Sequence, residues 1–332
     1  MKTLTRITCA LMALMIAACD NAGNNANANQ PAKATIQYPF KVTTTCGMVT
    51  DIVKVVAGDK GKVTGLMRAG VDPHLYKPKS SDNSSIIESD IIFYSGLMLE
   101  GRMADTFVKA ARQGKPAYPV TELIDESYLL EPEDFEGHWD PHVWMDVAAW
   151  SKAVGAVAKA LSEFDPANAA YYKTNADAYQ KQLEGLHGYV KKSIASIPRE
   201  KRVLITAHDA FNYFARAYDI EVKGVQGIST ESEAGLQHIN EIVDFIVENK
   251  IGAVFVESTV NPRYVESLIE GAKARGQNVV IGGELFSDAM GEEGTYEGTY
   301  LGMLDHNATI ITRALGGQVP KGGMNNQLSE HE

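Results

Sequence analysis

Cysteine is nearly absent from this sequence of 332 residues, which contains only Cys9, Cys19 and Cys46. Because Cys9 and Cys19 lie close to the start, a single cysteine remains for the body of the chain, and a disulfide framework is excluded. Cys46 lies in an apolar, β-branched run, which indicates a small buried side chain and not a reactive thiol.

Positive charge is also scarce, since 31 lysines and arginines face 42 aspartates and glutamates, for a formal net charge of −11. This balance argues against a nucleic-acid partner, and we expect none. It is compatible with a cationic ligand. Beyond the first residues, no stretch is long and apolar enough to cross a membrane as a helix.

The N-terminus has the order of elements that is typical of a secretory signal peptide. Two basic residues precede an apolar run, residues 7–18, that is too short to span a bilayer. The run ends in the letters IAAC at residues 16–19, which resembles the bacterial lipobox, a signal that is cut before a cysteine that carries lipid. We therefore predict a signal peptide over residues 1–18 and a lipidated Cys19 that attaches the protein to a membrane. The alternative is an ordinary signal peptide with an incidental cysteine.

Residues 20–35 are rich in Asn and Ala and lack large apolar side chains. Such a segment cannot bury enough surface to offset the entropy lost on ordering. We predict that residues 19–37 are a flexible, lipid-anchored linker. The protein is then extracytoplasmic, in a periplasm or at a cell surface, and held by an anchor instead of a membrane span.

The rest of the chain alternates strand-like and helix-like segments, which predicts parallel sheets with helices on both faces. The segments with strand patterns are residues 40–46, 62–67, 90–95, 117–120, 202–206, 252–257 and 278–281. The segments with helical patterns are residues 48–57, 97–113, 147–164, 210–218, 233–249, 262–275 and 299–315.

One long helix is predicted between the two halves. Asp165 is a good N-cap and Pro166 a good first-turn residue, and no further proline occurs up to Ile197. Apolar residues recur at helical spacing over this stretch, although Gly185 and Gly188 weaken its middle. The helix would extend for about 45–50 Å, enough to run along a two-lobed molecule.

The fold class is therefore α/β, with two lobes of parallel sheets flanked by helices and joined by one long helix. We expect, in chain order, an N-terminal lobe, the connecting helix, a C-terminal lobe and a loose tail, over residues 38–165, 166–198, 199–316 and 317–332.

Three of the eight histidines stand where a strand pattern ends or a loop begins. His74 and His142 each follow an Asp-Pro pair, and proline stiffens the chain before the imidazole. His208 follows the strand 202–206. Because loops after parallel strands gather at one crevice, His74 and His208 are expected to face each other from the two lobes, and Asp288 also lies in a loop beyond a strand. Three imidazoles and one carboxylate are suitable ligands for a d-block cation.

Other roles for these residues stay open at this point. A histidine after Asp-Pro can be a turn residue, and Asp288 can cap the next helix. Glu257 ends an apolar strand, where it can orient a ligand histidine or form an ion pair or cap. His138 can recruit metal from its loop or simply face solvent.

Five segments in one order resemble the zinc/manganese solute-binding proteins of ABC transporters. They are GVDPHLY at 70–76, DPHVWMD at 140–146, TAHDAFNYF at 206–214, GISTESEAG at 227–235 and GGELFSD at 282–288. The resemblance implies two α/β lobes joined by a long helix, with one Zn²⁺ or Mn²⁺ per chain between them. It places the metal ligands at His74, His142, His208 and Asp288. It also implies a monomer that is not an enzyme and that delivers its metal to an ABC transporter permease.

The choice between the two metals rests on small features. Manganese-specific members of that family often have Glu where this chain has His208, and many zinc members have a His-rich loop where residues 131–138 hold only His138. Three imidazoles bind zinc more tightly than manganese, which favours zinc slightly.

Two alternative functions remain, a metal-dependent hydrolase that uses the same site and a surface adhesin lipoprotein. Catalytic zinc keeps an open coordination position, whereas four protein ligands close the site. Nothing in the sequence encodes a receptor-binding feature.

Overall fold

The N-terminal lobe is built on a parallel four-stranded sheet in the order β2-β1-β3-β4. Its strands are β1 (Phe40–Thr44), β2 (Gly61–Gly65), β3 (Ile91–Tyr94) and β4 (Ala117–Pro119). Its helices are α1 (Gly47–Ala57), α2 (Ser80–Glu88) and α3 (Ala104–Arg112). The computed structural model describes residues 36–328, so the predicted signal peptide, Cys19 and nearly all of the predicted linker lie outside the described residues.

The C-terminal lobe contains two parallel strand pairs, β5–β6 and β7–β8, with β5 next to β7. The strands are β5 (Val203–His208), β6 (Glu221–Gln226), β7 (Ala253–Glu257) and β8 (Val280–Leu285). The helices are α6 (Asn212–Tyr218), α7 (Leu236–Glu248), α8 (Arg263–Ala274) and α9 (Tyr300–Ala314). Because parallel strands share a direction, the ends of β5 and β7 bring His208 and Glu257 to the same side of the lobe.

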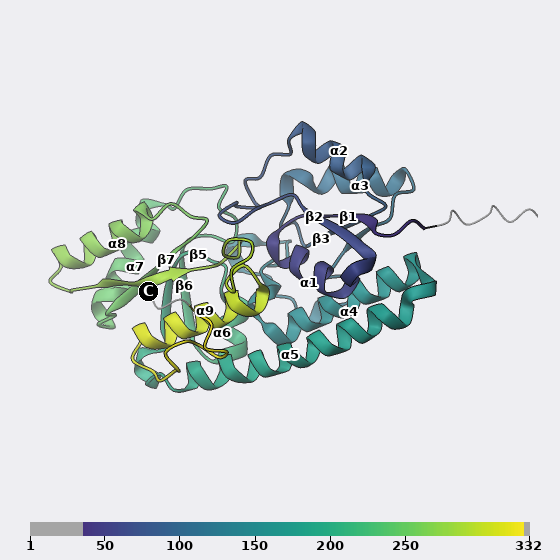
Figure 1. The fold of residues 1–332 in the computed structure, drawn as a ribbon. Coiled ribbons are helices and arrows are strands. Elements are labelled where there is room, and N and C mark those ends of the chain that lie inside the picture. The colour runs from purple at the N-terminus through teal and green to yellow at the C-terminus, as the bar shows by residue number, and fades with distance from the viewer. Residues whose placement is uncertain (1–35, 329–332) are drawn as a thin grey trace, which may run out of the picture. The chain divides into compact units, whose positions relative to one another are not determined.

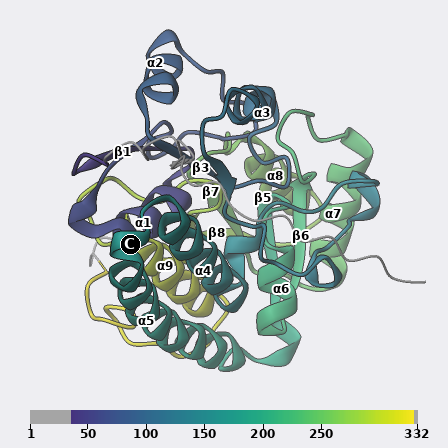
Figure 2. The same ribbon diagram turned by 90° about the vertical axis from the view of Figure 1, so that its right-hand side faces the viewer.

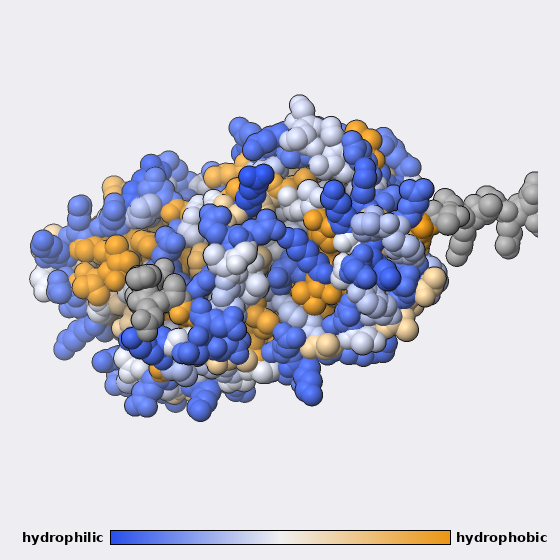
Figure 3. All heavy atoms as spheres, in the orientation of Figure 1, coloured by the Kyte–Doolittle hydropathy of each residue, from blue (hydrophilic) through white to orange (hydrophobic). Residues whose placement is uncertain are grey.

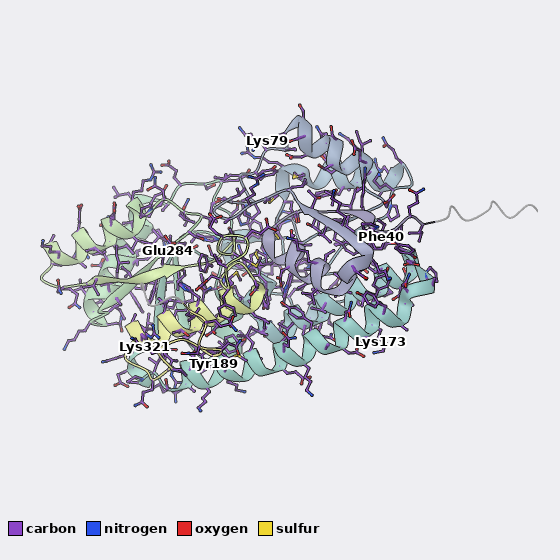
Figure 4. All side chains as sticks on the ribbon, in the orientation of Figure 1. Phe40, Lys79, Lys173, Tyr189, Glu284 and Lys321 are labelled. Carbon is purple, nitrogen blue, oxygen red and sulfur yellow. The ribbon has the colours of Figure 1, made fainter. Side chains whose placement is uncertain are left out.

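Two helices connect the lobes, α4 (Val147–Phe164) and α5 (Ala169–Ala195). The 27 residues of α5 extend for about 40 Å and run beneath both lobes, as Figure 1 shows. One face of α5 is buried, and the helix packs against α4 and α9 (Figure 2). Tyr189 of α5 points toward α9, where its hydroxyl lies 2.8 Å from that of Thr309 (Figure 4). The prediction of one continuous helix through Gly185 and Gly188 is confirmed.

The start of the long helix differs from the prediction. Asp165 caps a short 3₁₀ turn, Pro166–Asn168, and α5 begins only at Ala169. The Asp165 carboxylate makes no hydrogen bond to the backbone of α5. It accepts hydrogen bonds from the side chains of Tyr38, Asn168 and Tyr172 instead. Two of these donors, Asn168 and Tyr172, lie at the N-terminus of α5, so Asp165 is joined to the start of the helix through side chains.

The predicted helix over residues 97–113 is wrong in its first part, because α3 begins only at Ala104. Gly96, Leu97 and Met98 all have positive φ, which no right-handed helix allows. The turn is held by the buried Glu100, whose carboxylate accepts hydrogen bonds from the backbone of Ser95 and Gly96. Positive φ at Leu97 and Met98 costs about 1–3 kcal/mol each, so these contacts must offset a real strain.

Two elements were absent from the sequence prediction, and a third was misplaced. Helix α2 has a polar sequence, SSDNSSIIE, without an apolar stripe, and strand β6 has only half-buried residues over most of its length. Strand β8 runs through Gly282 and Gly283, two residues that the strand pattern had excluded. Asp288 still lies in the loop beyond this strand, as predicted.

Residues 317–328 belong to the predicted loose tail and lie against α9. The buried carboxylate of Asp305 accepts a hydrogen bond of 2.8 Å from the backbone of Met324. Arg313 donates to the carbonyl of Pro320 at 3.1 Å. On the face drawn in Figure 3, hydrophilic residues cover most of the surface, and apolar residues form separate patches. Within residues 36–328, no helix combines the length and the hydropathy that crossing a membrane requires.

Candidate metal centre

His74 lies in the loop that follows β2, in a turn built by Asp72 and Pro73. The Asp72 carboxylate accepts a hydrogen bond of 2.8 Å from the backbone N–H of His74, two residues further on. This is the local geometry by which aspartate forms a turn with its own chain. The His74 ring is 5% exposed and points into the interface between the lobes.

His142 lies at the N-terminus of a short 3₁₀ helix, Val143–Met145, just before α4. The carboxylate of Asp140 accepts two hydrogen bonds from it, at 2.9 Å from the backbone N–H and at 2.8 Å from ring Nδ1. Asp140 therefore fixes both the backbone and the ring of His142. Nε2 faces the site, where it lies 3.3 Å from Nε2 of His74.

His208 is the last residue of β5, and Glu257 is the last residue of the neighbouring β7. The Glu257 carboxylate accepts hydrogen bonds of 2.8 Å from the His208 backbone and 2.5 Å from ring Nδ1. Both residues are buried. This contact is the one that an orienting role for Glu257 requires, and it is equally an ion pair when His208 carries a proton.

Asp288 approaches the three imidazoles from the loop after β8. This loop is held by Trp144, whose indole N–H donates to the carbonyl of Ser287 at 2.9 Å, and Tyr300 in turn donates to the carbonyl of Trp144 at 2.7 Å. One Asp288 oxygen lies 3.3 Å from Nε2 of His142. The other lies 3.3 Å from Nε2 of His208 and 3.5 Å from Nε2 of His74.

The structure thus brings together all four predicted ligand residues, His74, His142, His208 and Asp288. One donor atom from each lies within 4.8 Å of the others. Both oxygens of Asp288 and Nε2 of His208 are buried, and within the described residues they have no hydrogen-bond partner. Buried polar atoms without partners are rare in folded proteins, so this group of atoms fits a bound cation.

The charges of the site are strongly coupled. Burial alone would lower the pKa of His142, but the carboxylates of Asp140 and Asp288 outweigh it and raise this pKa to about 9. Burial would also lower the pKa of His208. The carboxylates of Glu257 and Asp288 outweigh burial and raise this pKa well above its usual value. Burial would raise the pKa of Asp288, but His208 and His142 hold it well below its usual value. His74 differs, because burial lowers its pKa to about 3.

The other histidines that the structure describes lie apart from this group of four. His138 lines a cavity of about 860 Å³ in front of His74, together with residues of both lobes. Sequence reasoning did not assign carboxylate roles to Asp72 and Asp140, because it treated the two Asp-Pro pairs only as stiff elements. An aspartate two residues before a histidine was the signal that could have identified them.

We expect Glu257→Gln to weaken metal binding by about 10- to 100-fold. The Glu257 carboxylate on Nδ1 of His208 fixes the imidazole ring and makes Nε2 a more basic ligand. Glu284→Gln, on the neighbouring strand and exposed, is the matched control. Isothermal titration with zinc measures both. Equal affinities for the two variants would show that Glu257 has no part in the site.

The absence of a side chain at Gly224 lets the backbone of β6 pack closely against the end of β5. A Cβ at Gly224 would lie 2.5 Å from the backbone nitrogen of Asp209 and 2.7 Å from the carbonyl carbon of His208. Because backbone cannot move aside, we expect Gly224→Ala to lower the free energy of unfolding by about 1–3 kcal/mol and to displace His208. Gly188→Ala, which meets open space on α5, should be neutral or stabilising in the same denaturation experiment.

Two α/β lobes that are joined by a long helix and enclose three imidazoles and one carboxylate define a class of two-lobed solute-binding proteins. The comparisons with known proteins agree with this class. The chain belongs to the family described as "ZnuA: Zinc-uptake complex component A periplasmic", whose model matches residues 42–314.

Individual relatives are similar over most of their length. "Manganese-binding lipoprotein MntA" of Bacillus subtilis (strain 168) is 44% identical over 276 residues, which are 83% of this chain and 90% of the relative. "Zinc-binding protein TroA" of Treponema pallidum (strain Nichols) is 46% identical over 274 residues, with 82% and 88% covered. The solved structure of that periplasmic zinc-binding protein has a TM-score of 0.80, with 83% of this chain and 98% of that chain covered. Fe(III)-bound YtgA of Chlamydia trachomatis has a TM-score of 0.77 at 28% identity, with 85% and 99% covered.

Proposed function

We propose that the protein binds one divalent transition-metal ion outside the cytoplasm and delivers it to an ABC importer. The observation that carries this proposal is the convergence of His74, His142, His208 and Asp288 on one buried point. Both oxygens of Asp288 and Nε2 of His208 lack a hydrogen-bond partner within the described residues, and His142 and His208 each hydrogen-bond a carboxylate through Nδ1. A cation at this point satisfies every one of these atoms.

The geometry favours storage and release of the metal over catalysis. Three Nε2 atoms and the carboxylate of Asp288 would fill four coordination positions of a bound zinc ion, or five if both carboxylate oxygens bind. A hydrolytic zinc needs an open position for water and substrate. The chain is therefore proposed to be a binding protein and not an enzyme, in agreement with the names of its relatives.

Zinc and manganese are both supported as cargo. The names of two relatives with similar identity, 44% and 46%, point to manganese and to zinc respectively. Three neutral imidazoles favour zinc, because affinity for nitrogen ligands rises along the divalent series from manganese toward copper and zinc. The metal that is loaded in the cell also depends on which one is available.

The proposed location follows from the sequence and from the relatives. Several relatives are named lipoproteins, and the family description contains the word periplasmic. A lipidated Cys19 would tether residues 36–328 to a membrane beside the permease. The partner is expected to be the permease of an ABC importer in that membrane.

Uptake of radioactive zinc and manganese by cells that express the chain tests the proposal. Loss of the protein should reduce uptake of one metal, and the unaltered chain should restore it while His142→Ala should not. Uptake that is equal with and without the protein would reject a role in import.

A further inference from the structure

Residues 227–235, which we call the strap, connect β6 to α7 in the C-terminal lobe. Hydrogen bonds from two side chains hold the strap on its own lobe. Gln226 donates to the carbonyl of Ser232 at 2.9 Å, and Arg263 donates to the carboxylate of Glu233 at 2.8 Å. The strap also lines the cavity of about 860 Å³ in front of His74, so it forms one wall of the space between the lobes.

Two residues in the middle of the strap contact the N-terminal lobe. The hydroxyl of Thr230 donates to Asp72 Oδ2 at 2.5 Å, and Arg102 donates to Glu231 at 2.9 Å. The Arg102–Glu231 pair is roughly half exposed on both sides, and such pairs contribute little. Thr230 is 9% exposed, and its bond ends on a carboxylate. It is therefore the stronger of the two contacts that the strap makes with the N-terminal lobe.

Asp72 carries this link directly to a proposed metal ligand. Its other oxygen, Oδ1, accepts the backbone N–H of His74 at 2.8 Å. His142 and His208 are each fixed by a carboxylate on Nδ1, and within the described residues His74 has no such carboxylate. The orientation of His74 therefore depends on its backbone, and hence on Asp72. Asp72 is fixed in turn by a hydroxyl of the opposite lobe.

We propose that Thr230 is a positioning residue that couples closure of the lobes to retention of the metal. This inference rests on the proposed function and concerns the same site. With the lobes closed, Thr230 fixes Asp72, and Asp72 presents His74 to the metal. When the strap moves away from the N-terminal lobe, Asp72 loses its partner and His74 loses its orientation. His74 is then the first ligand to leave, so the strap sets the rate of release.

The test compares zinc dissociation from the full chain and from Thr230→Val, Thr230→Ala and Thr230→Ser, measured by stopped flow into excess chromogenic chelator. Ser232→Ala is the matched control, because it removes a hydroxyl from the same strap that has no hydrogen bond to the opposite lobe within the described residues. Metal content and the melting temperature of the metal-free protein are measured for each variant.

We expect about one zinc per chain in every variant, and dissociation that is about 5- to 20-fold faster for Thr230→Val and Thr230→Ala, since each loses one hydrogen bond to a charged group. Thr230→Ser and Ser232→Ala should release zinc as the unaltered chain does. An unchanged rate for Thr230→Val and Thr230→Ala would overturn the strap proposal, as would a Thr230→Ser variant as fast as either. Absence of zinc from the unaltered chain would instead overturn the proposed function, and the strap proposal with it.

Discussion

Replacement of His142 by alanine is expected to lower the affinity for zinc by about 100- to 1,000-fold. Four-ligand zinc sites contribute about 10–16 kcal/mol in total, so one ligand accounts for about 3–4 kcal/mol. His142 is fully buried, and its loss also leaves Asp140 and one oxygen of Asp288 without their imidazole. Two buried carboxylates without a partner add to the loss.

His238→Ala is the control for this variant, since His238 is an exposed histidine on α7. Its affinity should match that of the unaltered chain within about twofold. Competition with a chelator of known affinity measures both variants, and circular dichroism of the metal-free proteins checks that each is folded. Equal affinities for His142→Ala and His238→Ala would mean that the imidazole of His142 does not bind the metal.

Metal affinity is expected to fall by about 10- to 100-fold for each unit by which the pH drops from 7.5 toward 5. In the metal-free protein, the pKa of His142 is about 9, so this ring carries a proton at neutral pH, and Glu257 and Asp288 raise the pKa of His208 in the same direction. His74 has a pKa of about 3 and carries none. The metal must therefore displace one or two protons when it binds.

Titration calorimetry in buffers of different ionisation enthalpy counts these protons directly. We expect one or two protons released per zinc ion at pH 7. No proton release, together with the same affinity at pH 5 and at pH 7.5, would contradict a site with three histidine ligands.

The stability of the metal-free protein should change with pH in the opposite sense. A histidine whose folded pKa is raised contributes stability that is complete below its unfolded value of 6.5 and is lost as the pH rises through about 9. The metal-free protein should therefore lose stability between about pH 6.5 and 9, while its metal affinity increases. The metal-loaded protein should not show this loss, since its imidazoles bind the cation.

The sequence predicted the two lobes, the long helix and the four converging residues because their signals are local. Helical spacing persists through α5 despite Gly185 and Gly188, and Val147–Phe164 was predicted at its observed bounds. The Asp-Pro-His pairs and the strand ends placed the ligands on loops that a parallel sheet brings together. Position after a strand placed His74, His208 and Asp288 at one crevice, and the family resemblance completed the set with His142.

The errors arose where distant residues decide the local structure. Leu97 and Met98 fit a helical pattern, but Glu100 holds them in a left-handed turn with the help of Thr45, which is 55 residues away and donates to it at 2.6 Å. The contact between Thr230 and Asp72 joins residues 158 positions apart. No local pattern in a single sequence contains such information.

Competitive metal loading tests the central claim most directly. The full chain and a His208→Glu variant are stripped of metal, offered zinc and manganese together, and analysed for metal content by mass spectrometry. The account predicts about one zinc per unaltered chain and a shift toward manganese in the variant, because a carboxylate replaces an imidazole. An unaltered chain that retains manganese against zinc would contradict the zinc preference, and the absence of bound metal from both proteins would contradict the site itself.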